Sequence, residues 1–338
     1  MKRDYGKMAM VFVIIFGALL ATRALAASDK PIEINHATEH AITSIDGKIV
    51  VEWLAEIEKR TGGKVKGMVL PGGAMGKGQD LYNLVRTGAA GSATVLAIDF
   101  EVADFMNVPF KVSGALTGAA LAYELYYKGY FDKRLGGTKL MFMTSTAPFR
   151  LFTVKKPINK LEDLKGMKIR AAAPQIAQTI KAYGAVPVSL SPSEIYMALE
   201  RGTVDGIITS MGLIHGAKLY ELVKYALWEP LGLGPLMNIM NMDLWNKIPG
   251  DVQAIMQEVN PMMMYRYVDY HTDLDNEGLA FMKGKGLKIN NLSSGERARW
   301  EKVAWEVHEK ILMETWKARG VQAETLMQEL LRVSERYK

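Results

Sequence analysis

The sequence predicts an α/β protein in which parallel or mixed sheets are covered by helices. Residues 32–98 and 167–209 carry this prediction, because strand and helix patterns alternate along both stretches. The chain has 338 residues, of which 49% are apolar and 23% are charged. This is the composition of a globular protein, and the length is sufficient for two domains.

In the first half of the chain, apolar spacing and turn residues define the expected elements. Strands are expected at 32–36, 65–70, 92–98, 140–144 and 150–154, and helices after residue 44 or 46, at 78–86 and at 115–127. The first helix illustrates the signal, because Ile49, Trp53 and Ile57 recur on one face and Gly62 ends it.

The second half continues the alternation and then becomes helical. Strands are expected at 167–170, 186–190, 204–209, 236–242 and 287–289, and helices at 174–183, 191–201, 213–220, 249–283, 295–316 and 324–337. The longest of these helices is expected to be interrupted or kinked near Pro261, because proline lacks the backbone N–H that an interior position requires.

The first 26 residues have the pattern of a secretory signal peptide. Lys2, Arg3 and Lys7 precede an apolar run at 8–21, and cleavage is expected near Ala26. The run is short for a membrane span, although an uncleaved N-terminal anchor is the alternative. No second run of spanning length follows, so the mature protein is expected to be soluble and periplasmic.

Charge and cysteine usage exclude several classes of protein. The formal net charge is +6, but no basic run or interleaving of aromatic residues with arginines occurs, which disfavours nucleic-acid binding. The absence of cysteine excludes disulfides, thiol chemistry and a lipid-modified cysteine after the leader.

The organising stretch of the chain is residues 157–184. Arg170 ends a predicted strand shortly before Pro174, which is a favourable first residue of a helix. A guanidinium beside the free N–H groups of a helix N-terminus can hold a carboxylate. The alternative is a solvated arginine at the end of an ordinary strand.

A second candidate site lies on the strand at 150–154. Arg150 and Phe152 share one strand face, which suits a cleft wall that holds a charged group and an apolar body. An edge strand with Arg150 in solvent is the alternative. Thr209 and Met211 lie where another strand ends, and Trp228 is a plausible aromatic wall.

Several motifs together resemble the solute-binding proteins of tripartite ATP-independent periplasmic (TRAP) transporters. The motifs are residues 71–76, Pro109-Phe110, residues 161–170, 193–196 and 198–206, and residues 240–245 followed by 247–249. Their order and spacing extend the resemblance over essentially the whole mature chain.

The resemblance implies a two-lobed periplasmic binding protein fold with a solute cleft and a long helix spanning both lobes. Lobe one would comprise 28–147 plus 236–275, and lobe two 148–235 plus 276–338. Hinge closure would bury the solute, and the closed form would dock on the membrane permease.

The resemblance also assigns roles to particular residues. Arg170 matches the arginine that pairs with the solute carboxylate, and Arg150 matches a second contacting arginine. Thr209 replaces a solute-binding asparagine, while His36 and His40 lie in a loop that borders the cleft. The aromatic and apolar side chains that could pack against the solute are Phe149, Phe152, Met211 and Trp228.

These departures favour a compact or apolar-bodied organic acid over a polyhydroxylated sugar acid. Residues 95–97 are Val-Leu-Ala, where the sialic-acid binders of the family offer a glutamate. The core of each lobe remains an alternative location for the aromatic and apolar residues. No cofactor and no metal are expected, since His36 and His40 lie outside a predicted helix.

The expected function is capture of a carboxylate and its delivery to TRAP permease subunits by a monomeric protein that is not an enzyme. A ligand-binding partner of a membrane signalling protein is the alternative. An exported hydrolase is less favoured, because the sequence has no Gly-x-Ser-x-Gly, zinc-helix motif or cysteine nucleophile.

Overall fold

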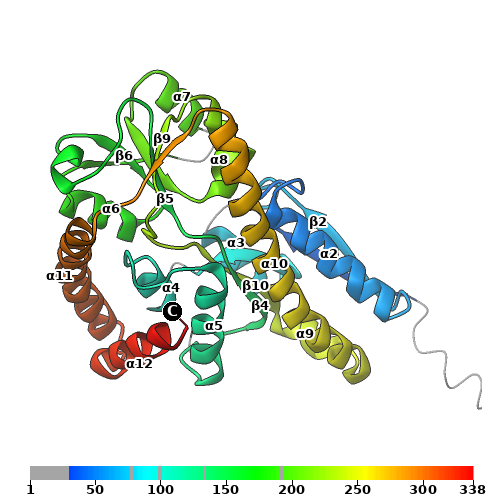
Figure 1. The fold of residues 1–338 in the computed structure, drawn as a ribbon. Coiled ribbons are helices and arrows are strands. Elements are labelled where there is room, and N and C mark those ends of the chain that lie inside the picture. The colour runs from blue at the N-terminus through cyan, green and yellow to red at the C-terminus, as the bar shows by residue number, and fades with distance from the viewer. Residues whose placement is uncertain (1–29, 77–78, 98–100, 132–133, 191–193, 338) are drawn as a thin grey trace, which may run out of the picture.

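The structure is a computed structural model that describes residues 30–76, 79–97, 101–131, 134–190 and 194–337. Its strands form a five-stranded and a six-stranded sheet, which build the two lobes seen in Figure 1. The expected α/β class with two lobes and mixed sheets is therefore confirmed. We call the lobe with the five-stranded sheet lobe one and the other lobe two.

Lobe one has the strand order β2-β1-β3-β10-β4. Its strands are β1 (Ile32–Ala37), β2 (Val65–Leu70), β3 (Ser92–Leu96), β4 (Thr138–Ser145) and β10 (Pro235–Asn241). Its first helices are α2 (Ile45–Arg60), α3 (Gln79–Arg86), α4 (Glu101–Met106) and α5 (Ala115–Tyr127). β1 is parallel to β2 and β3, whereas β10 is antiparallel to β3 and β4. Of the two expected caps for α2, Ser44 is the N-cap, and its hydroxyl accepts a hydrogen bond from Gly47 N at 3.1 Å.

Lobe two has the strand order β11-β9-β5-β8-β6-β7. Its strands are β5 (Arg150–Thr153), β6 (Lys168–Ala171), β7 (Val186–Ser189), β8 (Gly206–Thr209), β9 (Tyr225–Leu227) and β11 (Lys288–Asn290). Its helices are α6 (Pro174–Ala182), α7 (Ile195–Glu200) and α8 (Met211–Gly216), with 3-10 turns η1 (Leu161–Leu164) and η3 (Leu219–Glu221). Gly166 has φ 74°, as expected of the turn before β6.

A long helix connects the lobes. After the short α9 (Met242–Lys247), α10 (Gly250–Gly284) runs for 35 residues, packs first on α2 and β4, and ends against α8 (Figure 1). The expected spanning helix is thus present. The expected interruption near Pro261 is absent, because this proline lies inside one continuous helix. The neighbouring Asn260 accepts a hydrogen bond from the indole of Trp53 at 2.9 Å, which ties α10 to α2.

The C-terminal helices depart from the expected lobe boundaries. α11 (Ser294–Ala318) begins beside α6 of lobe two and runs towards α12 (Ala323–Arg336), which lies beside α5 of lobe one (Figure 1). Trp316, Leu326 and Leu330 are fully buried with residues of α4 and α5 in the core of lobe one. The expected assignment of 276–338 entirely to lobe two therefore disagrees with the packing of the second half of α11 and of α12.

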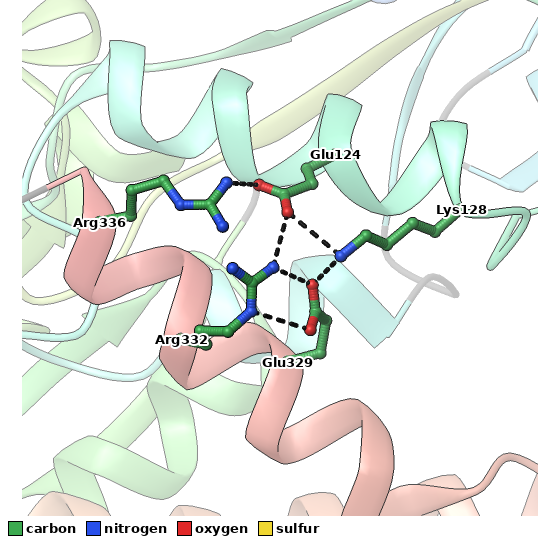
Figure 2. A network of polar contacts seen from close by, with 5 residues as sticks. All are labelled: Glu124, Lys128, Glu329, Arg332 and Arg336. Atoms are coloured by element: carbon green, nitrogen blue, oxygen red, sulfur yellow. Dashed lines mark hydrogen bonds and ion pairs between the residues drawn. The ribbon is translucent and has the colours of Figure 1, made fainter.

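An ion-pair network fastens α12 to α5. Glu124 and Lys128 at the end of α5 interact with Glu329, Arg332 and Arg336 of α12 (Figure 2). Arg332 donates to Glu124 at 2.8 Å and to Glu329 at 2.6 Å, and Arg336 donates to Glu124 at 3.1 Å. Glu329 also pairs with Lys128. Each carboxylate thus has two or more cationic partners, which makes the network more effective than isolated surface pairs.

This network predicts a pH-dependent contribution to stability. The hydrogen bonds from Arg332 and Lys128 lower the pKa of Glu329 from 4.5 to about 2. Its contribution is therefore complete above about pH 4.5 and is lost as the pH falls towards 2. We expect the wild type to unfold at a higher temperature than Glu329→Gln at neutral pH, and the difference to shrink on acidification. A difference in unfolding temperature between the two proteins that stays constant across this pH range would contradict the assignment.

Candidate functional site

Three predicted site residues lie on one face of the sheet of lobe two, near the carboxyl ends of two of its strands. In the strand register, Arg170 of β6 lies opposite Ile207 of β8, and Arg150 of β5 lies opposite Thr209 of β8. Paired residues point to the same face of a sheet, as do residues two apart on one strand. Arg150, Arg170 and Thr209 therefore share a face near the carboxyl ends of β6 and β8, where α/β sheets bind ligands.

Arg170 is a buried cation without an acidic partner in the described part of the chain. The residue is only 6% exposed, and its Nε and Nη2 donate to the carbonyl of Leu190 at 3.2 and 3.1 Å. Burial lowers the pKa of Arg170, yet an arginine remains protonated in proteins. A buried charge with only neutral partners is unfavourable, so this position favours the arrival of an anion.

The helix that follows Arg170 adds to this preference. α6 begins at Pro174, and its N-cap residue Ala173 makes no side-chain hydrogen bond to the helix. The first N–H groups of a helix carry partial positive charge and can bind an anion. The expected strand–arginine–helix arrangement is therefore present in the structure.

Arg150 is also buried, but it already has a partner. Its Nη2 pairs with Asp275 of α10 at 3.1 Å, its Nη1 donates to the carbonyl of Pro148 at 3.0 Å, and its Nε has no partner among the described residues. The guanidinium lies 3.9 Å from the centre of the Trp228 ring. Burial lowers the pKa of Arg150, while the carboxylates of Asp275 and Glu229 act in the opposite direction. An anion at Arg150 would have to share this cation with Asp275.

The expected role of His36 at the cleft is wrong for this structure. His36 is fully buried, and its ring nitrogens lie 2.9 Å from the hydroxyls of Ser92 and Thr94. Burial lowers the pKa of His36 to about 3, so the ring is neutral. The reason is strand periodicity, because His36 shares a face of β1 with Ile34 and packs edge-on against Trp53 under α2.

His40 lies in the loop after β1 and is partly exposed. Its Nδ1 is 3.3 Å from the carboxylate of Asp46 in the first turn of α2. Asp46 in turn accepts a hydrogen bond from Tyr267 of α10 at 2.5 Å. His40 therefore remains a candidate solute-binding residue of lobe one, and its contact with Asp46 fixes its position.

Of the apolar and aromatic residues expected to pack against the solute, three lie in the core of lobe two and one lies beside Arg150. Phe152 is fully buried in a core cluster that includes residues of α7 and α8, and Phe149 belongs to the core cluster on the other face of the sheet. Met211 is 2% exposed and packs so closely on α10 that a methyl group on Gly278 would lie 3.0 Å from its Cγ. These three side chains are core residues here, as the alternative reading allowed, whereas Trp228 remains partly buried beside Arg150.

Three residues on α10 escaped the sequence analysis, whereas Leu96 of β3 lies in the stretch 95–97 that was expected to border the cleft. Tyr267, His271 and Asp275 are spaced by four residues and therefore lie along one face of α10, between the two lobes. Their spacing was a readable signal, although it resembles that of a buried helix face. In lobe one, Leu96 at the carboxyl end of β3 is 37% exposed and offers an apolar surface.

Comparisons with known proteins agree with this architecture. The family model for bacterial extracellular solute-binding protein, family 7, matches residues 36–315. The C4-dicarboxylate-binding periplasmic protein DctP of Rhodobacter capsulatus is 27% identical over 323 residues, which cover 88% of this chain and 93% of that protein.

Two solved structures share the fold. A TRAP periplasmic solute-binding protein from Desulfovibrio salexigens, in an open complex, has a TM-score of 0.83 at 23% identity and covers 91% of this chain and 97% of its own. A marine metagenome TRAP solute-binding protein specific for aromatic acid ligands has a TM-score of 0.83 at 19% identity, covering 91% and 99%. The resemblance predicted from the motifs is confirmed, and the chain belongs to family 7 of the bacterial extracellular solute-binding proteins.

Proposed function

We propose that this protein captures an organic-acid anion between its two lobes and delivers it to the membrane subunits of a TRAP transporter. The observation that carries the proposal is Arg170, a buried guanidinium without an acidic partner among the described residues. In a water-poor site, each charge-assisted hydrogen bond to a carboxylate contributes about 1.5–3 kcal/mol. The planar guanidinium can also fix the orientation of the carboxylate through two parallel bonds.

The surroundings favour an acid with one carboxylate and an apolar body. Asp275 already neutralises much of Arg150, which leaves Arg170 as the stronger anion partner. Leu96 and Trp228 supply apolar surface from opposite lobes. The relatives include binders of both dicarboxylates and monocarboxylates. One is named as a C4-dicarboxylate-binding protein, and another was solved with metahydroxyphenylacetate.

Capture requires the lobes to open and close. Four of the described segments cross between the lobes. Two are the connections from β4 to β5 and from β9 to β10, and the other two are the helices α10 and α11. Crossings of this kind act as hinges in two-lobed proteins. The residues around Arg170 belong to lobe two and those around Leu96 to lobe one, so closure would bury the acid between them.

Family members are periplasmic, and export of this chain is part of the proposal. The expected signal peptide, residues 1–26, lies outside the described residues. Among the described residues, no helix is both long enough and apolar enough to cross a membrane. Export with cleavage near Ala26 and a monomeric state remain predictions, which the intact mass and the native mass of the periplasmic protein would check.

Native mass spectrometry of the purified protein tests the solute class directly. We expect a co-purified small carboxylate, which chemical analysis identifies and which the protein leaves unchanged on incubation. Adding that acid back to refolded protein at 100 times its Kd should stabilise the fold by about 2.7 kcal/mol, because only the folded state binds it. A neutral or cationic co-purified solute, or turnover of the acid, would reject the proposal.

A further inference from the structure

His271 is buried at the place where α10 passes from lobe one to lobe two. The residue is 3% exposed, and its ring centre lies 4.6 Å from that of Tyr267, the partner of Asp46 in lobe one. On the other side, a methyl group on Gly212 of α8 would lie 3.8 Å from Cε1 of His271. Since α8 starts directly after β8, the ring lies near the same strand ends that carry Thr209.

The hydrogen-bonding capacity of this ring is unused within the part of the chain that the structure describes. Neither Nδ1 nor Nε2 of His271 has a hydrogen-bond partner within the described ranges, although both atoms are buried. The other two buried histidines are better paired. His36 has partners on both nitrogens, and His308 has Thr179 at 2.7 Å from Nε2, although its Nδ1 has no partner among the described residues. Buried polar side chains are normally paired, so an unpaired ring between two lobes points to a bound molecule.

The charge state of His271 restricts what that molecule can offer. Burial lowers the pKa of His271 to about 4, and the nearby carboxylate of Asp46 only partly offsets this effect. The ring is therefore neutral near pH 7, with one nitrogen that donates and one that accepts. A neutral imidazole suits a hydroxyl group, which can do both, better than a second carboxylate, which only accepts hydrogen bonds and cannot pair with the accepting nitrogen.

We infer that His271 is a specificity-determining residue of the solute site, where it binds a hydroxyl group of a hydroxylated monocarboxylate. The inference rests on the proposed function, in which Arg170 holds the carboxylate of the same solute. Opening of the lobes would uncover the ring, because α8 belongs to lobe two and the partner of Tyr267 belongs to lobe one. The acid thus carries its hydroxyl on the side that faces α10.

Two pairs of acids test this inference: lactate with propionate, and 3-hydroxyphenylacetate with phenylacetate. Calorimetric titration of the wild type should show a preference of about tenfold for the hydroxylated acid of a pair, the size expected for one buried hydrogen bond. In His271→Phe, which keeps an aromatic ring without nitrogens, the preference should fall to about one. Binding of the plain acid should change by less than about threefold.

Two further measurements complete the test. His308→Phe makes the same change at another buried histidine and should retain the preference for the hydroxylated acid. The unliganded His271→Phe protein should unfold at or above the wild-type temperature, because the change removes two unpaired buried nitrogens. A wild type without the preference, or a His271→Phe protein that keeps it, would overturn the inference.

The outcome for Arg170 separates this inference from the function on which it rests. If Arg170→Met loses both acids of a pair while His271→Phe keeps the hydroxyl preference, only the role of His271 is rejected. If Arg170→Met still binds both acids as the wild type does, the carboxylate assignment itself fails.

Discussion

Replacing Arg170 by methionine should weaken binding of the co-purified acid by roughly 10²–10³-fold. The side chain supplies up to two charge-assisted hydrogen bonds to the carboxylate, and each factor of ten corresponds to about 1.4 kcal/mol. Isothermal titration gives the change in Kd, and the ligand-induced rise in melting temperature should disappear with it. An unchanged rise would show that other groups hold the acid.

The same variant separates binding from folding. Methionine removes a buried charge that has no acidic partner in the described structure, and this gain offsets the lost bonds to Leu190. We therefore expect the unliganded Arg170→Met protein to melt within a few degrees of the wild type. Arg170→Lys should recover little affinity, because lysine cannot make two parallel bonds to one carboxylate. Arg201→Met, at an exposed position after α7, should bind normally.

Replacing Asp104 by alanine should lower the free energy of unfolding by about 3 kcal/mol. Asp104 is 2% exposed and accepts hydrogen bonds from Arg319 at 2.7 Å, Trp316 at 3.2 Å and Gln175 at 2.7 Å. Its removal leaves the buried indole N–H of Trp316 unpaired and breaks a largely buried ion pair. Because Gln175 belongs to α6, the variant also loses a link between the lobes.

Chemical denaturation of the unliganded proteins measures this loss. Asp251→Ala is the matched control, because Asp251 pairs with Lys64 at 2.8 Å but both side chains are more than 60% exposed. We expect the control to change stability by less than about 0.5 kcal/mol. Equal effects of the two substitutions would mean that the contacts of Asp104 contribute no more than a surface pair does.

Most elements could be predicted from local sequence, because apolar spacing and turn residues act over a few neighbours. The strand at 65–70 and the helix at 115–127 have the expected bounds. α4 was not predicted, because it has only six residues before Asn107 and all of them are buried, so no amphipathic pattern exists. The location of α12 in lobe one depends on contacts with α5 that are distant in sequence, and no local pattern encodes them.

The candidate site also contains residues that local sequence reveals and residues that only the spatial structure reveals. Arg170 was found because a strand end, an arginine and a helix start are adjacent in sequence. His36 was misassigned because the resemblance implied that it lies in a loop bordering the cleft, whereas it belongs to β1 and its side chain is in the core. His271 was missed because a single histidine on the buried face of a long helix resembles a core residue. Only the spatial structure shows that its nitrogens lack partners among the described residues.

The position of α12 has a consequence for biogenesis. The core of lobe one includes residues from β3 near position 92 and residues as late as Val333. During synthesis, this half of the molecule cannot finish folding until α12 has been translated, because the apolar residues of α12 complete its core. Lobe one therefore remains incompletely folded until α12 emerges from the ribosome, and loss of α12 would expose apolar surface in a lobe built largely from residues far earlier in the sequence.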